Sequence, residues 1–280
     1  GLVGSYNFKK EISLNIIFTV LIFLASYYLY VLTGDFLQWT AFGIGVYVIC
    51  NWIHGLKNRD PVAFLLIFKS KALLLGLLSF PFITFVTYAL GAFGPSFYIR
   101  NFSMTATEVG IIYGLITVFG SMIGVICGGI LGDKLRETYV NGKLYLIMAS
   151  AVLTGVTAIG FIHSENLVAS FTWKFVYHIA STAWLGCAAS TVTELVLPRL
   201  RAVASAFFIL MLSMIGLALG PYLTGMVSDI YINSGLLPGP ALKNAMTLTL
   251  VVLVLPFGLL AVACNSVSYT HLTLPTICSV

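Results

Sequence analysis

Two ionisable side chains stand one helical turn apart inside an apolar stretch of the sequence. Lys174 and His178 are four positions apart, a spacing that puts both on one face of a helix. An ionisable group in such a stretch is costly unless it is paired or faces a wet cavity, so both are candidates for binding or proton transfer. Histidine titrates near neutral pH and suits proton transfer. A hydrogen-bonded packing histidine explains the sequence equally well.

Lys174 also lies close to the start of its predicted helix. It is seven residues from Leu167, roughly 10 Å at 1.5 Å per residue. Long basic side chains at that depth commonly reach the polar interface, and we favour this outcome. In the alternative, the amine faces a cavity beside aromatic residues, where it would suit an amphiphile with an anionic head group.

Polar and aromatic residues on other stretches could face the same cavity. Thr84 and Tyr88 follow helical spacing, Trp184 continues a polar-aromatic stripe with Tyr177 and Ser181, and Tyr113 stands in a further apolar run. We treat Thr84, Tyr88, Tyr113 and Trp184 as candidates for lining a cavity or coupling.

Glu194 is the remaining candidate, near Arg199 and Arg201. An ion pair at the inner surface is favoured over a coupling carboxylate. We expect no catalytic residue, cofactor or metal, because four cysteines fall inside apolar runs without a CxxC pair and read as packing residues. They are Cys50, Cys127, Cys187 and Cys264.

The composition requires a membrane. Of 280 residues, 59% are hydrophobic and 8% charged, whereas soluble domains carry about 25% charged residues. We predict an all-α, polytopic transmembrane bundle, because lipid leaves no partner for an unpaired backbone group. Its eight expected spans are 12–33, 36–54, 72–99, 107–132, 143–163, 167–196, 201–231 and 244–264.

Basic residues orient the bundle. If residues 1–11 are cytoplasmic, the outer loops hold only Arg100 and Lys243, which predicts a plasma or inner membrane with 1–11 and 265–280 inside. The charge therefore reflects orientation, and nothing indicates nucleic-acid binding. The inner side then carries Lys9, Lys10, Lys57, Arg59, Lys69, Lys71, Lys134, Arg136, Lys143, Arg199 and Arg201.

Glycines recur every fourth residue in the fourth span and end in a charged loop. The stripe predicts close approach of a second helix. The charges that follow it are expected at the cytoplasmic surface, where simple orientation of the helix is one reading of them. The stripe is Gly120, Gly124, Gly128 and Gly132, and the loop, GGILGDKLRE, holds Gly128, Gly129, Gly132, Asp133, Lys134 and Arg136.

These features resemble the major facilitator superfamily. Glycines closing a helix, then Asp133, Lys134 and Arg136, are similar to that family's signature loop, with Glu137 departing from the pattern. Residues 197–229 and 91–116 most resemble the spinster-like branch. The resemblance implies that 72–264 is a six-helix carboxyl-terminal half and that Asp133 holds the missing amino-terminal half when the inner gate closes.

The seventh span combines small residues with a proline. Gly216, Gly220 and Gly225 allow close approach, and Pro221 removes a backbone hydrogen bond. A rocking element of alternating access and a static packing kink are equal readings.

The rest of the chain divides into three parts. We interpret 1–54 as an inserted helix pair, with the end of the amino-terminal half as the alternative, and 55–71 as a cytoplasmic connector with an interfacial helix. Residues 265–280 are a polar tail that resembles translated adapter sequence more than a native end.

The resemblance implies secondary active transport by alternating access, with proton coupling. The expected partners are membrane lipids and a small organic or amphiphilic, lipid-like solute. Nucleotide-binding, zinc-protease and serine-hydrolase motifs are missing, so we expect no enzyme. A receptor or assembly scaffold with the same fold is the alternative.

Overall fold

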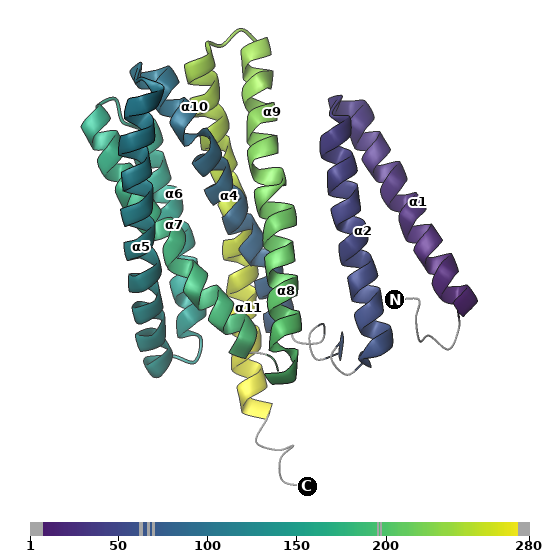
Figure 1. The fold of residues 1–280 in the computed structure, drawn as a ribbon. Coiled ribbons are helices and arrows are strands. Elements are labelled where there is room, and N and C mark those ends of the chain that lie inside the picture. Colours follow the sequence, from purple (N-terminus) through teal and green to yellow (C-terminus); the bar gives the residue numbers. More distant parts are fainter. Residues whose placement is uncertain are drawn as a thin grey trace. The chain divides into compact units, whose positions relative to one another are not determined.

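The computed structural model describes residues 8–61, 64–65, 68, 71–194, 196 and 198–273. Over these residues the fold is all-α, and the chain divides into two compact units, Gly1–Ser70 and Lys71–Val280. We call them the amino-terminal and carboxyl-terminal units. Figure 1 shows the helices of each.

The amino-terminal unit is a helical hairpin. Helix α1 (Phe8–Thr33) ends at Gly34, whose φ of +83° suits a residue without a Cβ, and α2 (Phe36–Arg59) begins two residues later. Trp39 Nε1 donates to Thr33 Oγ1 over 2.6 Å and fixes the turn. Helix α2 reaches Arg59, so 55–59 belong to that helix, and the expected connector begins later. The interfacial helix predicted beyond it falls largely outside the described residues.

Six long helical segments make up the described residues of the carboxyl-terminal unit. Four are single helices, and two are interrupted by a π-helical or 3-10 turn. The elements are α4 (Lys71–Phe102), α5 (Ala106–Thr138), α6 (Gly142–His163), α7 (Leu167–Glu194), η1 (Pro198–Leu200), α8 (Arg201–Met211), η2 (Leu212–Leu217), α9 (Leu219–Asn233), α10 (Pro238–Thr249), η3 (Leu250–Leu253) and α11 (Val254–Thr273).

Within the described residues, seven helical stretches are long and apolar enough to cross a membrane. They match seven of the eight expected spans. The remaining expected span, 167–196, corresponds to α7, a 28-residue helix that is not among the seven. Polar residues on its buried face, such as Lys174, His178 and Ser181, lower its mean hydropathy. The last helix continues to Thr273, where the sequence suggested an end near Cys264.

Helix α4 is the most buried of the membrane-crossing stretches and contacts α9, η2, α10 and α11, while α7 packs along both α5 and α6 (Figure 1). Where α4 and α6 end and α5 and α7 begin, Tyr98, Phe97 and Phe161 form a buried aromatic cluster, and the partly buried Phe171 packs against it. We call this the aromatic end. The opposite end, with Asp133, Lys143 and Glu194, is the basic end.

Candidate functional site

The glycine stripe joins α5 to α7, as predicted. All four of its glycines are buried, and a Cβ on any of them would collide with α7. At Gly128 the obstacle is the backbone of Ala183, and at Gly124 the backbone of Ile179. Helix backbones approach this closely only where side chains are absent. The stripe therefore sets the register in which α5 faces α7.

That register brings Thr117 of α5 opposite His178 of α7. Their Oγ1 and Nε2 atoms are 3.0 Å apart, and Thr117 Oγ1 also donates to the Tyr113 carbonyl over 2.8 Å. A hydroxyl has one proton and that carbonyl can only accept, so Thr117 accepts from an Nε2–H of His178. The contact holds the ring in one orientation.

A cavity of about 400 Å³ opens beside this pair, between α4, α5, α7 and the α8–η2 stretch. His178 lines it, together with Trp184, Thr84 and the half-exposed Tyr88. Four of the expected cavity residues are thus brought together. Further hydroxyl groups on the wall are those of Thr87, Thr117, Ser121, Ser181, Thr182 and Ser213.

Tyr113 and Lys174 lie outside the cavity lining. Tyr113 is buried, and its hydroxyl donates to the Gly91 carbonyl over 3.2 Å. The expectation that Lys174 reaches the interface was wrong, because its side chain is 0% exposed. Its Nζ stands over the rings of Phe161, Tyr177 and Tyr113, at 4.2, 4.4 and 5.0 Å from their centroids.

The α8–η2–α9 stretch has a π-helical turn just before Pro221. Ala218 N–H bonds to Ser213 O over 3.0 Å, a five-residue step. Gly216 and Gly220 pack against Thr84 and Phe85 of α4 with no room for a Cβ. Further along, Gly225 faces Phe93. The predicted close approach and interruption are both present, and the interruption places Ser213 on the cavity wall.

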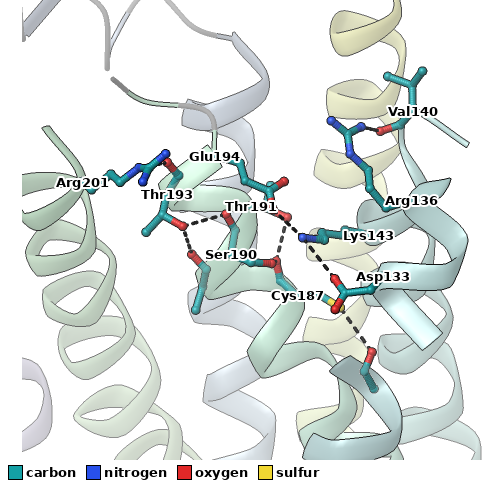
Figure 2. Close-up of polar contacts among 12 residues, drawn as sticks. Asp133, Arg136, Val140, Lys143, Cys187, Ser190, Thr191, Thr193, Glu194 and Arg201 are labelled. Carbon is teal, nitrogen blue, oxygen red and sulfur yellow. Dashed lines mark hydrogen bonds and ion pairs between the residues drawn. The ribbon is translucent and has the colours of Figure 1, made fainter. Parts of the chain in front are cut away.

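An ion network occupies the basic end (Figure 2). Lys143 Nζ lies 2.5 Å from Glu194 Oε1 and 3.4 Å from Asp133 Oδ1. Lys143 joins the start of α6 to the ends of α5 and α7. Glu194 thus forms the predicted ion pair, but with Lys143 and not with Arg201, whose Nε donates to the Thr193 carbonyl over 3.2 Å.

The charged segment that was predicted as a loop, residues 128–136, is helical, because α5 continues to Thr138. Arg136 donates to the Val140 carbonyl (Figure 2), and Asn141 Nδ2 donates to the Cys264 carbonyl over 2.9 Å. Lys134 makes no ion pair among the described residues. Lys143 was counted in the sequence only as an inner charge. Lys143 is the second residue of α6, and the connection from α5, which carries Asp133 near its end, is short. This position in the sequence could have indicated the ion pair between Lys143 and Asp133.

We compared the sequence and the structure of the chain with those of known proteins. No protein-family model matches the chain. An MFS-type efflux pump of Mycolicibacterium smegmatis is 32% identical over 149 residues, which are 53% of this chain and 34% of the relative. Protein spinster of Drosophila melanogaster is 26% identical over 173 residues, 58% of this chain and 28% of that protein. The chain thus spans about a third of these relatives.

A crystal structure of a bacterial homologue of the human lysosomal transporter Spinster, inward-facing and unoccupied, has the same fold. Its TM-score is 0.66 at 22% identity, and the match covers 76% of this chain and 52% of that one. Over about half of its length the chain is thus similar in sequence to a major facilitator efflux pump and to spinster proteins, and it shares the fold of the solved spinster homologue. The occupied inward-facing form of the spinster homologue matches with a TM-score of 0.56, 24% identity, and 85% and 57% coverage.

Proposed function

We propose that the chain works in a secondary active transporter, which moves a small organic or amphiphilic, lipid-like solute by alternating access. The main observation that supports the proposal is the cavity of about 400 Å³ described above. It lies at mid-helix positions of α4, α5 and α7, and polar groups from each converge on it, an arrangement typical of a transporter's central site. The efflux-pump and Spinster relatives support the same reading.

A second helical half completes this transporter in our proposal. The cavity is walled by four segments of one unit, and the match covers about half of the solved Spinster homologue. In the closed state Asp133 then exchanges Lys143 for a partner on that half, because a three-quarters exposed carboxylate is free to do so. Membrane lipids surround the unit, and a plasma or inner membrane fits the basic residues of the inner side.

The cavity wall favours a solute with both apolar and hydrogen-bonding parts. Tyr88 and Trp184 supply flat apolar faces, and the hydroxyl groups of α4, α5 and α7 supply donors and acceptors. Lys174 does not line the wall, so direct pairing with an anionic head group has less support than the sequence suggested. His178, which does line it, suits coupling to protons.

Sequencing the gene across the codon for Gly1 tests the second half. Six further spans in frame would support the proposal. A stop codon directly upstream would contradict it and favour a scaffold or a dimer of single units.

Transport itself is tested with the complete reading frame in proteoliposomes that carry an inward proton gradient. The probes are ethidium and a fluorescent single-chain phospholipid. We expect gradient-dependent movement of at least one, and a severalfold loss in His178→Phe. The matched control is Thr172→Val on the exposed side of the same helix. Equal rates in both variants would count against the cavity.

A further inference from the structure

Lys174 is the buried cation that the cavity does not explain. Its side chain is completely buried, and its Nζ has no hydrogen-bond partner among the described residues. Contacts with three aromatic rings stabilise a cation only partly. A permanent charge there would lack the counter-ion that such positions normally have.

The groups around the amine contain no carboxylate that pairs with it. Both ion pairs of the described residues belong to Lys143 at the basic end. The titratable neighbours are Tyr113 on α5, Tyr177 and His178 on its own helix, and Tyr98 on α4, whose hydroxyl is bonded to Ser170. On α6 the amine meets Phe161, and His163 of that helix bonds to Thr247 instead.

The cost of burying this charge can be removed in two ways: an anion can bind beside the amine, or the amine can lose a proton and become neutral. An anion would have to pass Tyr177, whose ring stands 4.4 Å from Nζ, and Tyr113 at 5.0 Å. Tyr177 and His178 line the cavity, whereas Lys174 does not. A proton needs only a hydrogen-bonding side chain, such as His178, or a single transient water molecule to pass between the cavity and the amine, whereas a carboxylate or phosphate group needs an opening of its own size. The geometry therefore favours the proton.

We propose that Lys174 and His178 form a buried proton site, in which the Lys174 amine gains and loses a proton during the transport cycle. In the step, an Nζ–H bond breaks, the electron pair stays on Nζ, and the proton passes to His178 Nδ1 or to a water molecule in the cavity. Like charges one helical turn apart repel, so at most one of the two side chains is in its positively charged form at a time. The inference rests on the proposed function and deepens its coupling.

The test is a titration of the whole protein with lysine labelled with ¹³C at Cε, followed by NMR from about pH 5 to about pH 9. The Cε shift differs between the charged and neutral amine. Loss of one signal in Lys174→Met assigns the residue. The methionine variant keeps the side-chain length and adds no buried polar group. If the methionine variant does not fold, Lys174→Arg serves instead, because it also removes the lysine signal.

We expect the Lys174 signal to move between the two forms within this range, while the ion-paired Lys143 stays in the charged form as an internal control. A Lys174 signal that stays charged throughout would overturn the inference and indicate an anion partner. One that stays neutral throughout would overturn it as well. The titration does not need transport, so failure of the uptake assay alone would refute the proposed function and leave this result standing.

Discussion

The carboxylate of Glu194 lies 2.5 Å from the ammonium group of Lys143, although 51 positions separate the two residues in the sequence. The pair joins the last turn of α7 to the first turn of α6 at the basic end. The side chain of Lys143 is largely buried there, and that of Glu194 is half exposed. This contact and the one to Asp133 are therefore both open to ionic screening.

Replacing the amine of Lys143 should lower stability in a salt-dependent way. In Lys143→Met, Asp133 and Glu194 lose their shared cation, and we expect a loss of about 1 kcal/mol in the free energy of unfolding. The loss should shrink at high salt, where ion pairs are screened. Unfolding of the purified protein in detergent at low and high salt measures both. Lys134→Met in the charged segment of α5 is the control, and equal losses in the two variants would contradict the network.

Adding one methyl group to Gly128 should separate α5 from α7. In Gly128→Ala the new Cβ meets the backbone of Ala183, which cannot rotate away, so we expect a loss of about 2 kcal/mol. The next residue is the control, because a Cβ on Gly129 meets nothing within 4 Å. Gly129→Ala should be neutral or slightly stabilising. Thermal unfolding of the two variants measures the difference in stability. Similar midpoints would argue against direct packing of the glycine stripe on the backbone of α7.

The Thr117 hydroxyl should hold the His178 ring. In Thr117→Val the bond to Nε2 is lost, and we expect a cost of about 1 kcal/mol. Nitrogen NMR of histidine-labelled protein should show a changed Nε2 signal for His178 and unchanged signals elsewhere. Thr172→Val, which loses only a bond to Val168, should leave all histidine signals in place. An unmoved His178 signal in Thr117→Val would refute the contact.

Pro221 should keep the α8–η2–α9 stretch from closing into regular helix. Because proline has no N–H, the carbonyl four residues earlier, at Leu217, lacks its helical donor. Pro221→Ala supplies one, and we expect a gain of about 1 kcal/mol with slower amide exchange between 212 and 225. Pro238→Ala is the control, since Pro238 is the first residue of α10, where no N–H is needed. Faster exchange in Pro221→Ala would be the contrary result.

The sequence predicted what depends on short repeats. The four-residue glycine spacing defined one face of α5, and the structure places that face on α7. Apolar run lengths located seven membrane-crossing stretches. Both predictions depend only on helix geometry, which fixes the face and the length of a helix from residue spacing along the chain, whatever the helix packs against.

Partners distant in the sequence could not be predicted. The cation opposite Glu194 was sought among nearby arginines, but packing of α6 on α7 supplies Lys143 instead. The depth of Lys174 along its helix was estimated correctly, yet depth does not say which way a side chain faces. Its aromatic surroundings come from α5, α6 and α7 together.

The two ends of the carboxyl-terminal unit are held by different forces. At the aromatic end, Tyr98 donates to Ser170, which donates to the Phe161 carbonyl, and Tyr98 stacks on Phe171 at 4.3 Å. These contacts join uncharged groups, whereas the contacts at the basic end are ion pairs. Raising the salt concentration would therefore weaken the contacts at the basic end and leave those at the aromatic end unchanged, so α5, α6 and α7 should separate first at the basic end.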